Sequence, residues 1–379
     1  MKKRLNLPLI SDVMLERGIS QVDIAENVDV TKGCVSSWLK PDKFPRPKHL
    51  LKLGEYLGID FKNLVIKSNV EGPQVAFRKS GNFSITERDL NSFQYVASLL
   101  KRLVPYVSID TLSKAPVLSE PKLDYEYVQK VAKSVRDEIK TESDPIKYED
   151  MIDHFKKLHT TIVPVLWGKS KKQGTHVLLP ESNTNWVYLN LDSKPFDFLF
   201  WMAHELGHSK APYMGYEEGE EFADAFAGAL LFSQEMSEKA YNDLVNVSDK
   251  WKQVDLIKEI AMKYVISPIT IYKEVEKFAR FNNLDSLNLE AERIIYRGTT
   301  KFNGQYKSIS EALFGEKVPN SKDYILACKD VFHSNFFDML KRYLSSNTST
   351  TPKFIADILE ISITDAHELW GELISDGTK

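Results

Sequence analysis

The sequence predicts a mainly α-helical protein with a small sheet, an α+β arrangement in its central part. Two observations favour this fold class. Apolar residues recur at helical spacing over 85–104, 122–141 and 146–158, and three short apolar segments, 160–166, 175–179 and 186–191, are typical of strands. Because a long apolar helix is expected directly after the third strand, we expect the sheet to pack on helices.

Composition indicates an ordinary globular chain. Its 379 residues are 42% hydrophobic, which is enough to form substantial cores. Cys34 and Cys328 lie far apart and offer no disulfide framework, so we expect a cytoplasmic protein. No apolar run approaches the roughly 18 residues of a membrane span, and the stretch after Met1 is too short for a signal peptide. We therefore expect no membrane partner.

Four regions are expected along the chain. The first is an all-α module, the second is a linker with Gly, Ser, Lys and Pro, the third carries the strands and the long apolar helix, and the fourth is mostly helical with no assigned role. Their bounds are 1–66, 67–84, 85–284 and 285–379.

The N-terminal region is expected to form four helices joined by short turns, over 6–17, 20–28, 32–39 and 47–57. The tight turn at 29–31 separates the second helix, with its small Ala25, from the third. This pattern resembles the Cro and phage-repressor type of helix-turn-helix over residues 8–66. In that type, early residues of the second helix of the motif face base edges in the major groove.

The resemblance implies a set of DNA contacts. Thr31 would cap the third helix. Gly33 departs from the pattern of this DNA-binding type, because glycine reads no base and weakens a helix by up to about 1 kcal/mol. An interaction module that does not bind DNA is the alternative. By position, Gln21 lies near a phosphate, Lys32, Gly33 and Ser37 face bases, Val35 and Trp38 anchor the helix, Ser36 touches the backbone, and Lys40 belongs to a basic group that neutralises phosphates.

The strongest chemical signal is the pentapeptide His204-Glu205-Leu206-Gly207-His208. On a helix, the two histidines lie one turn apart on the same face and can bind one cation. Glu205 can then take a proton from an attacking water. Two histidines satisfied within a core are the alternative, but the apolar run that begins at Pro195 predicts a buried helix, where unpaired charges are costly.

A third ligand is expected on a second helix that begins near Gly219. Glu220 and Asp224 have the i, i+4 spacing that suits a carboxylate ligand followed by a partner for the free N–H of a metal-bound histidine. Glu221 is the rival ligand. Small residues from Ala223 to Ala229 would let this helix approach the first one closely.

Together, these two helices resemble the ImmA/IrrE family of metallopeptidases. The likeness covers about residues 75–280 and includes the segment that begins at Val265. It implies a gluzincin-like Zn²⁺ site with His204, His208 and Glu220 as ligands and Glu205 as general base. Family members often have an apolar-Pro pair where this chain has Phe232-Ser233, and they commonly act on a repressor.

Other expectations concern the substrate and the C-terminal region. Tyr213, Tyr216 and His176 are candidate donors to a substrate carbonyl, although a packing or surface role is favoured for each. The strand 186–191 is a candidate edge for an extended peptide, with an ordinary sheet strand as the alternative. Residues 296–306 are expected to form strands, whereas 321–345 and 352–376 are expected to be helical. The segment 351–369 has a helix-turn-helix pattern without basic residues on its second helix, which indicates a packing or partner-binding module.

Two functions from different classes are consistent with these patterns. The first is a cytoplasmic zinc endopeptidase that binds double-stranded DNA and cleaves a protein regulator, a repressor or an antitoxin-like protein. The second is a non-catalytic transcriptional regulator that uses the peptidase fold to sense metal or a partner. The intact set His204, Glu205, His208 and Glu220 favours the first. A homodimer is compatible with either function.

Overall fold

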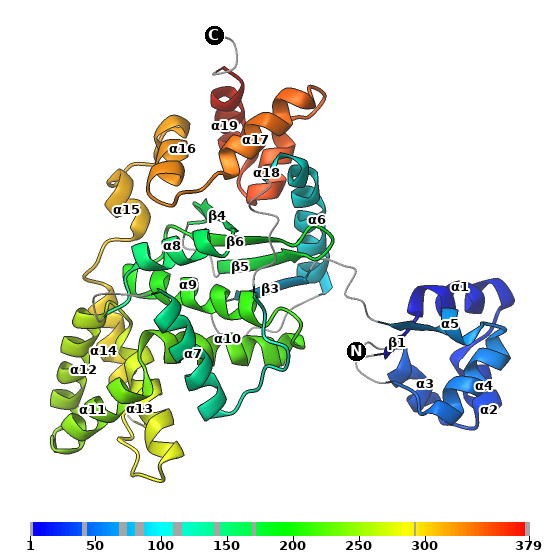
Figure 1. Cartoon of the computed structure of the whole chain (residues 1–379), viewed down its shortest axis with the longest axis horizontal. Coiled ribbons are helices and arrows are strands. Elements are labelled where there is room, and N and C mark those ends of the chain that lie inside the picture. Colours follow the sequence, from blue (N-terminus) through cyan, green and yellow to red (C-terminus); the bar gives the residue numbers. More distant parts are fainter. Residues whose placement is uncertain are drawn as a thin grey trace. The chain divides into compact units, whose positions relative to one another are not determined.

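The computed structural model of the chain forms two compact units, residues 1–71 and 72–379 (Figure 1). Each unit has its own hydrophobic core, and the expected segments 85–284 and 285–379 both fall within the second. Helices predominate, and the second unit adds a small mixed sheet. The structure describes residues 3–39, 44–67, 74–79, 87–108, 116–139, 145–168, 172–291 and 293–375.

The N-terminal unit contains the expected helices. They are α1 (Leu7–Arg17), α2 (Gln21–Val28), α3 (Lys32–Trp38) and α4 (Pro47–Leu57), followed by the short α5 (Phe61–Leu64). Ser20 caps α2 and forms a capping box with Asp23, and Thr31 caps α3 through the Cys34 N–H. These caps fix the turn between α2 and α3, and buried apolar side chains hold the helices together.

The expectation that this unit is all-α was wrong. Strand β1 (Lys3–Leu5) pairs antiparallel with β2 (Val65–Lys67) and joins the two ends of the unit. Each strand has three residues, which is too short for a recognisable alternation of apolar and polar residues. The pairing arises from a contact between distant parts of the sequence.

The second unit is built on a four-stranded sheet in the order β3-β5-β6-β4. The parallel pair is β4 (Thr160–Val165) with β6 (Thr184–Asn190), while β5 (Lys172–Leu179) runs antiparallel to both β6 and β3 (Gln74–Lys79). The sequence-predicted strands are confirmed. The expected peptide-binding edge at 186–191 was wrong, because β6 lies inside the sheet with a partner on each side.

Strand β3 also corrects the linker expected over 67–84. Five residues of that segment pair with β5, from Gln74 opposite Leu178 to Lys79 opposite Lys172. The signal was short and lay among Gly, Ser and Pro residues, which favour a linker interpretation. Backbone hydrogen bonding to β5, not local periodicity, defines this strand.

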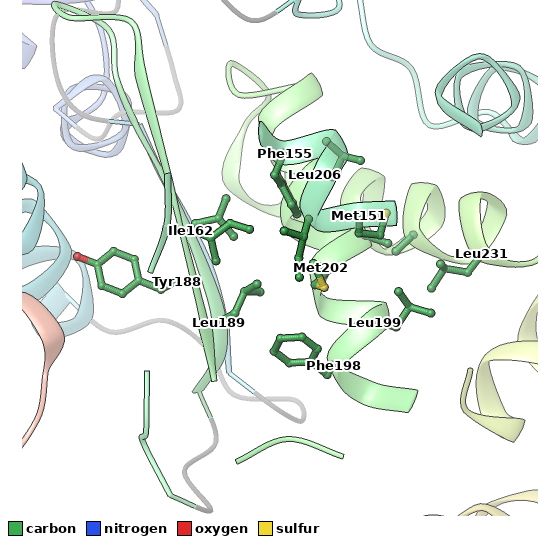
Figure 2. Packing of buried hydrophobic residues seen from close by; sticks show 14 of the residues in the cluster. Met151, Phe155, Ile162, Tyr188, Leu189, Phe198, Leu199, Met202, Leu206 and Leu231 are labelled. Carbon is green, nitrogen blue, oxygen red and sulfur yellow. The ribbon is translucent and has the colours of Figure 1, made fainter. Parts of the chain in front are cut away.

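One face of the sheet is covered by α8 (Tyr148–Lys157) and α9 (Pro195–Lys210). Figure 2 shows Ile162 and Leu189 pointing toward Met202 of α9, whereas Tyr188 points away from that helix. Side chains alternate between faces along a strand, so both faces of β6 are buried. Behind α9 lie α10 (Tyr216–Leu231) and α7 (Tyr125–Ile139).

The C-terminal helices cover the opposite face together with α6 (Glu87–Leu103). The Tyr188 hydroxyl donates to the Ile358 carbonyl at 3.0 Å, and the Trp167 indole donates to the Leu359 carbonyl at 2.9 Å. Both carbonyls belong to α18 (Pro352–Leu359). This face is completed by α17 (Phe336–Ser346) and α19 (Ile363–Ser375).

The pair α18–α19 has the same turn as α2–α3. In each pair, a residue with positive φ ends the first helix, the next N–H bonds to the carbonyl of an alanine, and a Ser or Thr caps the second helix. The expected helix-turn-helix pattern at 351–369 is therefore present in the backbone. Equivalent residues are Ala25 and Ala356, Asp29 and Glu360, Val30 and Ile361, and Thr31 and Ser362.

The strands expected over 296–306 were wrong, because α14 (Ile294–Asn303) is a helix. Its buried residues Ile295, Gly298 and Phe302 follow helical spacing. A Cβ at Gly298 would lie 2.5 Å from Val254 Cγ1, so glycine permits close packing against α12 (Lys250–Tyr264).

The remaining helices are α11 (Gln234–Val245), α13 (Pro268–Phe281), α15 (Ile309–Phe314) and α16 (Ser321–Asp330), and η1 (Val104–Tyr106) follows α6.

One expectation about the helices is refined, because the segment 321–345 is interrupted between α16 and α17. Within the described part of the chain, no helix combines the length and the apolar character needed to cross a membrane.

His154 of α8 is a buried titratable residue in the second unit. It is 2% exposed, and neither ring nitrogen has a hydrogen-bond partner among the described residues. Glu138 Oε2 lies 3.9 Å from its Nε2. Burial, together with the nearby positive charge of Lys210, lowers the pKa of His154 to about 4, so the ring is neutral at pH 7.

This low pKa predicts acid sensitivity. The unfolded chain takes up a proton at this residue below about pH 6.5, whereas the folded protein does so only near pH 4. The free energy of unfolding should therefore fall as the pH drops through this window, by about 2 kcal/mol at pH 5. His154→Phe should remove that part of the decline. Urea titrations at pH 7 and pH 5 measure it, and an identical decline in both proteins would contradict the assignment.

Candidate metal centre

The pentapeptide His204–His208 lies within α9, as expected. Pro195 occupies the first turn of this helix, and the apolar residues that follow pack against the sheet. His204 and Glu205 are 0% exposed and His208 is 3% exposed. Removal of these groups from water is costly unless they pair or bind an ion, so their neighbours decide what the site can do.

Close approach of α9 and α10 creates the site. A Cβ at Gly207 would lie 2.9 Å from Ala223 Cα and 3.1 Å from Phe226 Cδ1. Only glycine fits at this crossing without a shift of the backbone. The small residues on α10 thus do what the sequence predicted, and they bring the first turns of α10 next to the histidines.

The contact between the two helices places Glu220 beside both histidines. Glu220 Oε1 lies 3.2 Å from His208 Nε2, and Oε2 lies 3.6 Å from His204 Nε2. The two Nε2 atoms are 3.0 Å apart, and one donor atom from each of the three residues lies within 4.8 Å of the others. Glu221 is exposed and does not join this group. Of the two glutamates left open by the sequence, Glu220 is the one in position.

Asp224 supports the site from the next turn of α10. Its Oδ1 lies 3.0 Å from His204 Nδ1, which can donate to it. This bond fixes the tautomer of His204 and leaves Nε2 facing Glu220. Burial on its own would lower the pKa of His204, but the bonds to Asp224 and Glu220 outweigh it and raise the pKa to about 9.

The other two groups respond to the same surroundings. Burial lowers the pKa of His208. Burial would raise the pKa of Glu220, but its bonds to the two histidines lower it to about 2. With the buried Glu205 and the partly exposed Asp224, three carboxylates surround two buried imidazoles, an arrangement that favours a cation. Two imidazole nitrogens and one carboxylate oxygen are the donors of catalytic zinc sites, which keep a further position for water.

Gly174 of β5 is a site residue that the sequence analysis missed. A Cβ at this position would lie 2.5 Å from Glu205 Oε1. The carboxylate of Glu205 therefore packs directly on the backbone of β5, in space that any other residue would fill. Glycine within a strand can mark such a close approach, and that was the available signal.

The three candidate hydrogen-bond donors to a substrate carbonyl differ in their exposure. Tyr213 is 49% exposed and Tyr216 is 43% exposed. His176 is buried on β5, where its Nε2 lies 3.1 Å from Asn185 Oδ1. Burial lowers the pKa of His176 to about 3, and the charge of His208 adds to this effect. His176 thus lies in the same buried region as the metal centre, with one ring nitrogen engaged within the sheet.

The residues expected to contact DNA lie on α2, α3 and their turn. Lys32 and Gly33 are exposed at the start of α3, whereas Gln21, Ser36 and Ser37 are half-buried. Thr31 is exposed and acts as the cap of α3, and Lys40 lies outside the described residues. Val35 and Trp38 are buried, as expected for anchors. Of the expected DNA contacts, the structure therefore shows an exposed first turn of α3 that carries one lysine, Lys32.

Comparison with known proteins adds no assignment. No protein-family model, no curated protein and no solved structure matches this chain.

The choice between the two glutamates is directly testable. Glu220→Ala should lower zinc affinity by at least about tenfold, because the site loses its carboxylate donor. Glu221→Ala is the matched control, since this exposed neighbour on the same helix should leave the affinity unchanged. Competition with a fluorescent zinc chelator measures both. Equal affinities in the two variants would show that Glu220 is not a ligand.

Proposed function

We propose that this chain is a zinc-dependent endopeptidase with an N-terminal DNA-binding module, and that it cleaves a protein regulator. The observation that carries this proposal is the group His204, His208 and Glu220, with Glu205 next to the first ligand. A buried helix has no structural need for this combination, and the four residues together have the chemistry that peptide hydrolysis requires.

Each residue then has a defined role. His204, His208 and Glu220 would hold zinc, which when bound polarises a carbonyl and lowers the pKa of a water. Glu205 takes a proton from the attacking water and returns it to the leaving amine. Asp224 orients His204 through the 3.0 Å contact with Nδ1. The packing of Glu205 on Gly174 holds the carboxylate in place.

A polypeptide substrate is consistent with the surroundings of the site. Glu205 packs on a strand of the sheet, and strands present backbone groups that recognise extended chains irrespective of their sequence. A regulator as substrate is supported by the N-terminal unit, whose α2–α3 turn and exposed Lys32 fit a module that binds duplex DNA. The resemblance to the ImmA/IrrE family, whose members commonly act on a repressor, supports the same proposal.

The C-terminal helix pair is a poor candidate for a second DNA-binding site. Its second helix carries Asp365, Glu368 and Glu372 and no Lys or Arg among the residues of α19. Phosphate binding requires basic groups, and α18 is committed to the sheet through its carbonyls. We assign this pair to packing of the second unit.

The proposal predicts that metal binding and catalysis can be separated. Glu205→Gln should retain zinc and lose hydrolysis of a peptide substrate by at least about a hundredfold, because the general base is removed. His204→Ala should lose the metal itself. Metal analysis of both purified variants beside the wild type, with cleavage of labelled casein, makes the measurement. Absence of zinc from the reconstituted wild type would overturn the proposal, and zinc without hydrolysis would favour the non-catalytic regulator.

DNA binding is tested on the N-terminal unit. Lys32→Ala should weaken binding to a duplex selected from a random pool by about 1–3 kcal/mol, and binding should fall as salt rises. Lys353→Ala, on the C-terminal pair, is the control and should have no effect. Anisotropy titrations at two salt concentrations measure these changes. An unaltered, salt-insensitive affinity in Lys32→Ala would refute the groove-binding assignment.

A further inference from the structure

The strand next to the metal centre is covered by another segment of the same chain. In the sheet order β3-β5-β6-β4, β5 would be an outer strand if β3 were absent. Strand β3 pairs with it in antiparallel register, with Ala76 opposite His176 and Phe77 opposite Thr175. A segment near the start of the second unit thus occupies an edge that would otherwise be free to pair.

This edge belongs to the metal centre. Gly174, which contacts the Glu205 carboxylate, lies on β5 between the positions that pair with Phe77 and Lys79. Strand β3 also contacts α10, the helix that carries Glu220. Figure 1 shows β3 between β5 and α10. The backbone of β3 therefore lies beside the strand on which Glu205 packs, along the path that an extended polypeptide paired with β5 would take.

The site residues are buried in the structure, in which β3 is paired with β5. Glu205 is 0% exposed, His208 is 3% exposed, and the side chain of Glu220 is 15% exposed. A general base must approach to hydrogen-bond distance of the reacting water and carbonyl. A polypeptide that pairs with β5 needs the edge that β3 occupies, and it also needs access to these buried groups.

The pairing of β3 has a weak end. Its register shifts between Phe77 and Lys79, beside Gly174. Such an irregularity leaves part of the ladder unpaired, and a six-residue outer strand is among the elements that open most readily. The end of β3 nearest the candidate metal centre, from Phe77 to Lys79, therefore has the less regular pairing with β5.

We propose that the edge of β5 is the surface on which this centre takes an extended polypeptide, and that Gln74–Lys79 occupies it as a displaceable inhibitory strand. This inference rests on the proposed function, because it assigns the substrate-binding mode and the regulation of the same site. Substrate and β3 then compete for one strand edge. A substrate segment that pairs poorly with β5 does not displace β3, so the centre stays closed to it. The centre can therefore select among substrates without a specific side-chain pocket.

The test uses the full-length chain and a peptide. In one variant, Gln74–Lys79 is replaced by six alternating Gly and Ser residues, which keeps the length of the chain and removes the tendency to form a strand. In a second, Ala76→Pro, one backbone N–H is lost. Val75→Thr is the matched control, because a β-branched residue is retained. The probe is a fluorescein-labelled peptide with the sequence of residues 72–81, with a scrambled peptide beside it.

We expect the Gly-Ser variant and Ala76→Pro to bind the labelled peptide at least about tenfold more tightly than the wild type or Val75→Thr, because the wild-type edge is open in only a small fraction of molecules. The scrambled peptide should bind weakly to all four proteins. Hydrogen exchange at the amides of β5 should be faster in the Gly-Ser variant and slower again with peptide. Cleavage of labelled casein by the zinc-loaded variant should rise by a similar factor.

Equal peptide affinity in wild type and both strand variants would overturn the proposal. Hydrolysis of the labelled peptide would also overturn it, because the segment would then be a substrate and not an inhibitor. Peptide binding and hydrogen exchange need no catalysis. Failure of casein cleavage in every zinc-loaded protein would therefore count against the proposed endopeptidase activity, while the binding measurements decide the role of β3 separately.

Discussion

The close contact between α9 and α10 is the constraint on which the candidate metal centre depends. Gly207 allows Ala223 to approach at a distance that no side chain would permit. This contact places Glu220 and Asp224, one turn apart on α10, against the histidines of α9. The sheet and the helices behind α10 hold both helices in position, so the geometry of the site follows from the packing of the whole second unit.

Burial gives the site its chemical character. Carboxylates and imidazoles in a dry interior raise or lower one another's pKa values, and the balance here favours a positive charge among Glu205, Glu220 and Asp224. A bound cation would neutralise the same excess of negative charge that holds a proton on His204. The burial that favours metal binding also excludes a polypeptide, which is why the position of β3 matters for the proposed activity.

One helix-turn-helix geometry is used in two ways in this chain. The turns at Asp29 and Glu360 have the same backbone conformation and the same hydrogen bond to an alanine carbonyl. Lys32 begins the second helix of the N-terminal pair, whereas Ile363 begins that of the C-terminal pair. The two pairs share their backbone geometry, and they differ in the charge on the second helix, which is basic at its start only in the pair that we propose to bind DNA.

The sequence by itself determined the features that depend on local spacing. These are the helices around the two turns, the helix that carries His204 and His208, and the candidate ligand Glu220, because helical periodicity fixes which side chains share a face. Tertiary structure alone decided between Glu220 and Glu221, placed Gly174 against Glu205, and paired β1 with β2 and β3 with β5. The physical reason is that strand pairing and helix contacts join residues distant in sequence, and short segments carry too little periodicity to reveal their partners.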